Sequence, residues 1–220
     1  MPAVLFASVP EPDRTRFIKA CEPRRFSAGD VVFNEGDQGD SLYLVARGRA
    51  IVRSTTSEGD SLAFDVVGPG EVLGLLGMVR PEHRRTATVV ALDDCTMRVM
   101  TLPVFDELRR RYPSCERALA ILMADHVERL SQQLLEAHYV PVVQRIARRV
   151  MRVAAMADEV APGTVLPLTQ QDVADLAGAA RPTTNQALKK REATGSIRLQ
   201  RGQLEIVDPV LLASQTELPR

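Results

Sequence analysis

Side chains that can bind nucleic acid are concentrated between residues 168 and 207. Five of them have the spacing of one helical face, namely Arg181, Asn185, Gln186, Lys189 and Lys190. Arginine, asparagine and glutamine can hydrogen-bond base edges, and lysine can pair with phosphates. The whole chain has zero net charge, but the segment from residue 178 to residue 203 contains one acidic residue, Glu192, and six basic residues. The basic residues are Arg181, Lys189, Lys190, Arg191, Arg198 and Arg201. This segment therefore carries the positive charge that a surface facing phosphate requires.

The apolar residues around this face predict two helices joined by a sharp turn. The first helix is indicated by apolar residues at helical spacing: Leu168, Val173, Leu176 and Ala177. They stop at Gly178, which readily adopts the positive φ of a turn. Pro182 suits the first turn of the second helix, which would pack on the first through Thr184, Ala187 and Leu188. Ala174 is small where the two helices must approach closely, so the pattern predicts a helix-turn-helix with a recognition helix.

A short hairpin is expected directly after the second helix. Apolar residues alternate in two runs separated by Arg201-Gly202, with Ile197 and Leu199 before this turn and Leu204 and Ile206 after it. Such a hairpin beside the helix pair would be a wing. The alternative is an ordinary helix pair whose basic face is merely solvated.

Composition places the chain among globular proteins. Of 220 residues, 45% are apolar and 25% are charged. The N-terminal apolar run, Val4 to Ala7, has no basic region before it, and no run approaches the roughly 20 apolar residues of a membrane span, so we expect a cytoplasmic protein without membrane contact. Cys21, Cys95 and Cys115 are far apart, which fits neither a disulfide framework nor a metal motif.

Short β-branched runs between Phe26 and about Thr101 predict a β-sandwich or barrel, in particular a jelly roll. The runs are Val31 to Phe33, Leu42 to Val45, Ala50 to Val52, Ala63 to Val67, Thr86 to Ala91 and Thr96 to Met100. Before them, Ser8 and Glu11 have the spacing of a helix cap, which predicts a helix from there to about Ala20.

A long helix is expected after the strands. Pro103 to Arg111 forms a short helix, and Ser114 caps a second one that runs to about His138. Its apolar residues step by three and four, which favours two parallel helices in a homodimer: Ala120, Met123, Val127, Leu130, Leu134 and Ala137. The alternative is that this seam packs on the chain's own sheet. The two roles can also be divided, with Leu119, Leu122 and Leu135 turned inward.

Pro141 ends this helix, because a residue before proline is disfavoured in the α region, and another amphipathic helix begins at Val142. We therefore expect a hinge at Tyr139 to Pro141, and a polar link from Asp158 to Thr164 that leads to the helix-turn-helix. The predicted domains are 1–113 for the β domain, 114–140 for the long helix and hinge, and 141–220 for the winged helix-turn-helix. The fold class is α+β.

In this order, the elements resemble the cyclic AMP receptor / fumarate-nitrate regulator (CRP/FNR) superfamily of bacterial transcription factors over nearly the whole chain. The motifs that carry the resemblance are Phe26-Ser-Ala-Gly-Asp30, Glu35-Gly-Asp37, Ser41-Leu-Tyr-Leu-Val45, Gly48, Gly70 to Gly77, Arg85-Thr-Ala87, and Leu168 to Val173 with Arg181 to Gln186. The resemblance implies a cyclic-nucleotide-binding-like β jelly roll. It also implies a homodimer on a pseudo-palindromic double-stranded operator, with control by a small-molecule or nucleotide effector.

The resemblance also implies where an effector would bind. Its pocket would comprise Gly74, Leu75, Leu76, Gly77, Arg85, Thr86, Leu130 and Ser131. Gly74 and Gly77 match the glycine-rich turn, and Arg85-Thr86 matches the pair that holds a cyclic phosphate. Leu75, however, replaces the glutamate that binds the ribose hydroxyl, and Leu130 replaces a threonine that touches the base. The first change alone would weaken cyclic AMP binding roughly ten- to a hundredfold.

Three effector hypotheses therefore stay open: a ligand less polar than cyclic AMP, no required ligand, or cyclic AMP itself. For Arg85, the alternative is a surface charge in a basic cluster with His83 and Arg84. No cysteine cluster or His/Cys pattern indicates an iron-sulfur centre or haem.

Matching positions in the family imply the DNA contacts. Arg181 can bond guanine and Gln186 adenine, whereas Pro182 stands where the best-known members have a glutamate. Phosphate contacts are expected from Thr169, Gln171, Thr183, Lys189, Lys190 and Arg201. Activation or repression would depend on the operator's position and on contacts with RNA polymerase.

Two other classes of protein are disfavoured by the residues. A cupin-type metalloenzyme needs several convergent ligands, but residues 26 to 101 contain one histidine, His83. An adaptor that senses a ligand without binding DNA is disfavoured by the basic face. No nucleophile triad or pair of catalytic carboxylates stands out, so we predict that the chain is not an enzyme.

Overall fold

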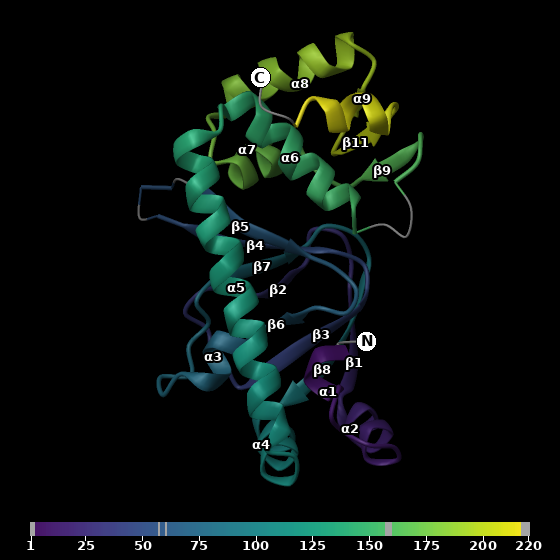
Figure 1. Ribbon diagram of the computed structural model, residues 1–220. Coiled ribbons are helices and arrows are strands. Elements are labelled where there is room, and N and C mark those ends of the chain that lie inside the picture. Colours follow the sequence, from purple (N-terminus) through teal and green to yellow (C-terminus); the bar gives the residue numbers. More distant parts are fainter. Residues whose placement is uncertain (1–2, 57, 60, 157–159, 217–220) are drawn as a thin grey trace. The chain divides into compact units, whose positions relative to one another are not determined.

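The computed structural model describes residues 3–56, 58–59, 61–156 and 160–216 (Figure 1). Contacts divide the chain into two units. The first comprises Met1–Ser54 and Asp65–Leu130, and the second comprises Thr55–Phe64 and Ser131–Arg220. The long helix α5, Ser114–Tyr139, belongs to both units in turn.

Two four-stranded sheets form the β domain, one in the order β1-β8-β3-β6 and the other β2-β7-β4-β5. The strands are β1 (Glu22–Phe26), β2 (Val31–Phe33), β3 (Ser41–Arg47), β4 (Ala50–Thr55), β5 (Ser61–Val67), β6 (Val72–Leu73), β7 (Thr88–Ala91) and β8 (Cys95–Thr101). The jelly-roll prediction is confirmed, and each of the six predicted runs contains a strand, although the run from Thr86 becomes a strand only at Thr88. Strands β1 and β6 were not predicted, because β1 has the sequence EPRRF and β6 is two residues long.

The core between the sheets follows from the alternation of residues in the strands. Tyr43 and Val45 of β3 and Cys95, Met97 and Val99 of β8 are buried, while Thr96 and Arg98, which alternate with these residues of β8, are half-buried. Successive residues of a strand face opposite sides, so each second residue of β8 enters this core.

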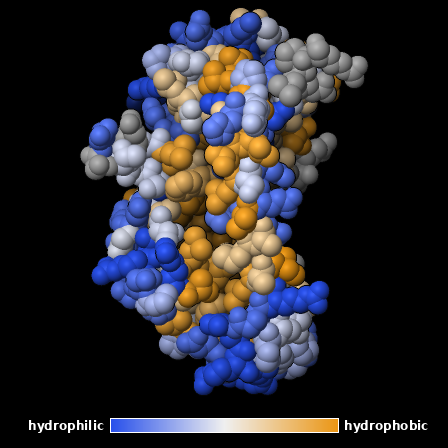
Figure 2. Space-filling model, turned by 60° about the vertical axis from the view of Figure 1, so that its left-hand side comes forward, coloured by the Kyte–Doolittle hydropathy of each residue, from blue (hydrophilic) through white to orange (hydrophobic). Residues whose placement is uncertain are grey.

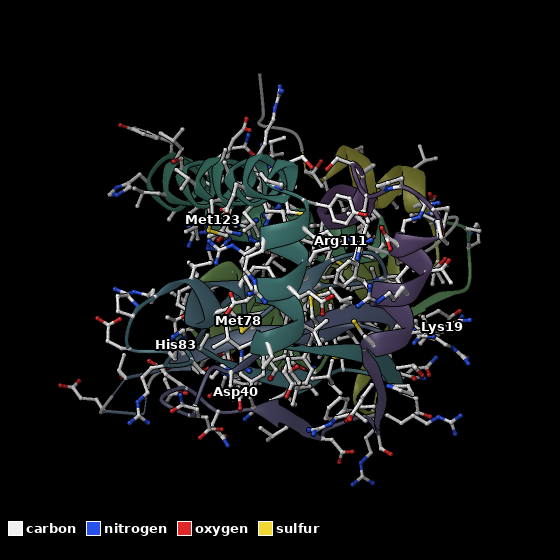
Figure 3. The ribbon with its side chains drawn as sticks, turned by 90° about the horizontal axis from the view of Figure 1, so that it is seen from below. Lys19, Asp40, Met78, His83, Arg111 and Met123 are labelled. Carbon is white, nitrogen blue, oxygen red and sulfur yellow. The ribbon has the colours of Figure 1, made fainter. Side chains whose placement is uncertain are left out.

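A helical layer covers a second core. It comprises α1 (Ala3–Phe6), α2 (Asp13–Ala20), α3 (Leu75–Val79), α4 (Leu102–Arg111) and the first turns of α5. Met78 lies in this core, called the helical core below, and Met123 packs against it (Figure 3). At the surface of the layer, Arg111 of α4 forms an ion pair with Asp13 of α2 at 2.8 Å.

The predicted N-terminal helix begins later than expected. Its first residue is Asp13 rather than one next to Ser8. The carboxylate of Glu11 accepts hydrogen bonds from the backbone N–H and the hydroxyl of Thr15, at 3.2 and 2.7 Å. Glu11 thus binds a free N–H of the first turn, which is the role that the sequence pattern assigned to Ser8.

Helix α5 agrees with its predicted limits and leaves much of the predicted seam exposed. Val127 is 62% and Leu134 is 61% exposed, and apolar side chains gather on the face that Figure 2 brings forward. Leu119 is buried and Leu122 packs against the helical core. The prediction that Leu135 turns inward is wrong, because it is 59% exposed and lies 12 residues beyond Met123, where this core ends along α5.

Besides Thr55–Phe64, the second unit contains the last turns of α5. Its further elements are α6 (Val142–Ala154), β9 (Thr164–Leu166), α7 (Gln170–Ala177), α8 (Arg181–Ala193), β10 (Ile197–Gln200), β11 (Gln203–Ile206) and α9 (Pro209–Ser214). The break before Pro141 and the helix after it are confirmed. Strand β9 was not predicted; it joins the hairpin in a sheet of order β10-β11-β9. Part of the predicted polar link, residues 158–159, lies outside the described residues.

Candidate nucleic-acid interface and β-roll site

The first helix of the pair begins with a reciprocal cap. The Thr169 hydroxyl accepts from the backbone N–H of Asp172 at 3.0 Å, and the Asp172 carboxylate accepts from the N–H of Thr169 at 2.9 Å. Two donors that a helix start leaves unpaired are thereby satisfied. Gln171 donates to Asp175 at 2.7 Å. Both predicted phosphate contacts of α7, Thr169 and Gln171, are exposed at its first turn.

The turn between α7 and α8 has the predicted chemistry. Gly178 caps α7 with φ +55°, a conformation that a residue with a Cβ adopts at a cost. Pro182 occupies the first turn of α8. The packing face is buried as expected, with Ala174 on α7 and Thr184, Ala187 and Leu188 on α8. The helix-turn-helix is confirmed.

The outer face of α8 exposes part of the predicted basic set. Arg181, Gln186, Lys189 and Lys190 are exposed, and Thr183 and Asn185 are half-buried. Arg191 is one of the six basic residues that the sequence places in this segment, but it is only 5% exposed. Its guanidinium donates to the carbonyls of Ala187 and Val143 at 3.1 and 2.6 Å. Its charge points into the domain, because positions 187, 188 and 191 share the buried face of the helix.

The wing is present as predicted. In the hairpin, Ile197 pairs with Ile206 and Leu199 with Leu204. Gly202 has φ +76°, and Arg201 beside it is exposed at the turn. Arg198 is already paired with Glu205 at 2.9 Å. The basic residues that are exposed on α8 and the wing are Arg181, Lys189, Lys190, Arg198 and Arg201, and Arg198 among them is paired with Glu205.

In the β domain, Arg85 is buried rather than part of a surface cluster. It is 4% exposed, and its Nη1 donates to the carbonyl of Ser41 at 2.8 Å while its Nη2 donates to the Ser41 hydroxyl at 3.0 Å. The guanidinium carbon lies 4.3 Å from the ring centre of Phe33 and 5.5 Å from that of Tyr43. Burial lowers the pKa of Arg85, and Tyr43 and nearby carboxylates partly oppose this. The surface alternative for Arg85 is therefore wrong.

The glycine turn packs directly on this guanidinium. Gly74 has φ +80°, its carbonyl accepts from Arg85 Nη1 at 3.4 Å, and a Cβ on Gly74 would lie 2.2 Å from that nitrogen. Gly77 is buried against the backbone of Gly39. The sequence identified both glycines but not Ser41, Phe33 or Tyr43 as partners of Arg85, since nothing in the chain order shows which strands meet.

The other predicted pocket residues differ in exposure. Leu75 is buried in the helical core, Leu76 is half-buried, and Thr86 is exposed. Leu130 and Ser131 lie on α5 and are exposed. The structure thus brings together Gly74, Leu75, Leu76, Gly77 and Arg85, with Thr86 next to Arg85 in the chain.

The thiols are buried, and burial raises the pKa of Cys21 and of Cys95 to about 11. Among the described residues, no three histidine, cysteine or carboxylate side chains gather as a metal site would require. In the same part of the chain, no helix combines the length and apolar character needed to cross a membrane.

Comparisons with known proteins agree with both parts. Residues 23–112 match the cyclic nucleotide-binding domain, and residues 144–214 match the Crp-like helix-turn-helix domain. The chain is 27% identical to the cyclic AMP receptor protein of Thermus thermophilus over 189 residues, 86% of this chain and 85% of that protein. It is 26% identical to the CRP-like cAMP-activated global transcriptional regulator of Mycobacterium tuberculosis over 198 residues, 89% and 88% of the two chains.

Solved structures share the fold. FixK2 from Bradyrhizobium japonicum superposes with a TM-score of 0.76 at 16% identity, over 91% of this chain and 99% of that one. The c-di-GMP responsive global regulator CLP of Xanthomonas campestris gives 0.74 at 20% identity, over 88% and 97%. Fold and sites thus define a transcription regulator with a cyclic-nucleotide-binding-type β domain and a DNA-binding helix-turn-helix. The chain belongs to the CRP/FNR superfamily.

Proposed function

We propose that the chain regulates transcription as a homodimer on a pseudo-palindromic operator. The observation that carries the dimer is the row of exposed apolar residues on α5, including Val127 and Leu134, at the spacing of two parallel helices. Val127→Glu with Leu134→Glu would place charges in this seam, and the protein should then sediment as a monomer. Unchanged sedimentation of this variant would contradict the dimer.

The recognition helices of such a dimer would enter successive major grooves about 34 Å apart. Arg181, Asn185 and Gln186 would read base edges. The phosphate contacts would come from Thr169, Gln171, Thr183, Lys189, Lys190 and Arg201. The exposure of Arg181, Gln186, Lys189, Lys190 and Arg201 supports this assignment.

We propose further that the effector pocket is degenerate, so that the effector is not cyclic AMP or none is required. Leu75 provides no acceptor for a ribose hydroxyl and lies in the helical core. The donors of Arg85 that would hold a phosphate already bind Ser41 and Gly74. The second candidate is a cyclic AMP-responsive regulator, which the glycine turn, Arg85-Thr86 and the names of the two relatives favour.

The two candidates are separated by fluorescence anisotropy of the full-length protein with a pool of palindromic duplexes, with and without cyclic AMP, at two salt concentrations. Salt-dependent binding without nucleotide supports the degenerate pocket. Binding that appears only on adding cyclic AMP supports the second candidate and means that Leu75 does not prevent an effector response.

We propose the same functional domains as the sequence predicts: the β domain at 1–113, the dimerisation helix and hinge at 114–140, and the winged helix-turn-helix at 141–220. The residues matched by the two family models fall within the first and the last of these domains. A regulator of this kind would act on the chromosome in the cytoplasm, with RNA polymerase as a further partner and without an enzymatic activity. Loss of binding to every duplex in the pool after Arg181→Ala with Gln186→Ala is expected. Retained affinity would mean that these two side chains do not read the bases, whereas an unaltered protein that binds no duplex, with or without cyclic AMP, would favour an adaptor.

A further inference from the structure

One arginine of α6 bonds the ends of two other helices. Arg145 donates through Nη1 to the carbonyls of Ala137 and Val140, both at 3.1 Å. Through Nε and Nη2 it donates to the carbonyls of Ala177 and Gly178, at 3.1 and 3.3 Å. The first pair lies at the end of α5 and the second at the end of α7, and all five residues belong to the second unit.

These carbonyls need a donor for a simple reason. The last turn of a helix leaves carbonyls without an intrahelical partner, and the helix dipole places partial negative charge there. A guanidinium offers five N–H donors in one rigid plane, whereas an ammonium offers three around one point. Arg145 can therefore serve two helix ends at once and hold them at one distance.

Two neighbouring arginines of α6 strengthen the same connection. Arg149 pairs with Glu136 of α5 at 2.8 Å and donates through Nε to the carbonyl of Leu176, again at the end of α7. Arg148 pairs with Glu136 at 3.0 Å. Glu136 is half-buried between them, so the last turns of α5 meet the helix-turn-helix through charged contacts that are partly shielded from water.

We infer that Arg145 is a positioning residue for DNA binding. Its guanidinium joins the end of the predicted dimer helix to the turn of the helix-turn-helix and so sets the direction in which α8 is presented. This inference rests on the proposed function for its DNA consequence. The connection that Arg145 makes between the ends of α5 and α7, called the joint below, is a property of the free protein.

The joint is tested first without DNA, by amide hydrogen exchange of the full-length protein. The reporters are the N–H of Val140, bonded to Glu136, and the N–H of Ala179, bonded to Ala174. Arg145→Ala should speed exchange at both helix ends about tenfold or more, since each hydrogen bond that it removes involves a charged donor. Exchange in α8 and in the β10-β11 hairpin should not change. Unchanged reporters, or faster exchange throughout the domain, would overturn the inference.

Arg145→Lys separates the planar guanidinium from its charge. Lysine keeps the positive charge but should reach one helix end only, so at least one reporter should exchange as fast as in Arg145→Ala. Full protection at both ends with lysine would overturn the inference. Arg110→Ala is the control, because it removes the same charge from an exposed arginine that donates to the backbone carbonyl of Asp106 in its own helix. This control variant should leave exchange at both reporters unchanged.

The consequence for DNA is measured with duplexes that carry two half-sites or one. A positioning residue matters when both recognition helices must bind together, so Arg145→Ala should weaken binding to the two-site duplex about tenfold and binding to the single site less than about twofold. Equal weakening on both duplexes would mean direct contact with phosphate and would overturn the positioning role. If the unaltered protein binds no duplex with or without cyclic AMP, the proposed function fails, while hydrogen exchange still decides whether Arg145 connects the two helix ends.

Discussion

The guanidinium of Arg85 stacks on the ring of Phe33, with its central carbon 4.3 Å from the ring centre, while its nitrogens bind Ser41 and Gly74. A cation over an aromatic face is stabilised by the ring's electrons, and more so away from water. Strand β2 provides Phe33, and the first residue of β3 provides Ser41. Arg85 thus connects the two sheets.

Replacement of Arg85 should therefore lower stability even without a ligand. Arg85→Ala removes the stacking and leaves buried acceptors at Ser41, so we expect the free energy of unfolding in urea to fall by about 2 to 4 kcal/mol. Arg84→Ala is the control, because that side chain is exposed and donates to the carbonyl of Gly36. It should cost less than about 1 kcal/mol. Equal stability of the two variants would contradict a structural role for Arg85.

Substitution of Gly74 should destabilise the protein nearly as much as substitution of Arg85. Two separate effects contribute, and a mutant cycle can distinguish them. Gly74→Ala would adopt φ +80° and would place its Cβ 2.2 Å from Arg85 Nη1. The strain alone costs about 1 kcal/mol, and the contact adds to it. In a double-mutant cycle with Arg85→Ala, the cost of the contact between the new Cβ and Arg85 should disappear. The coupling free energy between the two substitutions should then be about 1 kcal/mol or more. Strictly additive changes would show that Gly74 does not limit the position of Arg85.

His126 should make stability depend on pH. Burial and the neighbouring Arg129 lower its pKa in the folded protein, and Asp65 partly opposes them. The folded state therefore binds fewer protons than the unfolded state, so the stabilising contribution is present above the unfolded pKa of about 6.5 and is lost as the pH falls below it. His126→Gln should reduce the fall in stability between about pH 7.5 and pH 5.5, measured by urea unfolding. His138→Gln, a change at an exposed residue, should not.

The sequence was most informative where local chemistry decides the structure. Gly178, Pro182 and the alternation of the hairpin predicted the winged helix-turn-helix, because a positive φ, a missing N–H and a two-residue period are properties of neighbouring residues. The family resemblance assigned Arg85 to one effector pocket with the glycine turn, but its Ser41 partner lies 44 residues away in the chain. The same limit applies to Arg145, whose carbonyl partners carry no side-chain signal at all.

Arg191 shows a different limit, since a count of charges does not reveal burial. Within the part of the chain that the structure describes, its Nε has no hydrogen-bond partner, and burial lowers its pKa. Arg191→Leu removes the cost of burying this charge but also the hydrogen bonds to Val143 and Ala187, so we expect the free energy of unfolding in urea to change by less than about 1 kcal/mol. Arg191→Ala should lower it by about 2 kcal/mol or more, because a cavity remains as well.

The neighbouring residues Arg191 and Lys190 should then differ in DNA binding. Lys190 is exposed on α8, so Lys190→Ala should weaken binding to all duplexes similarly and reduce the slope of log affinity against log salt by about 0.9 for each phosphate that is no longer bound. Arg191→Leu should leave affinity and salt slope unchanged, since its guanidinium bonds Val143 and Ala187 inside the domain. Fluorescence anisotropy at several salt concentrations measures both. An equal change in slope for the two variants would mean that Arg191 turns outward when DNA binds.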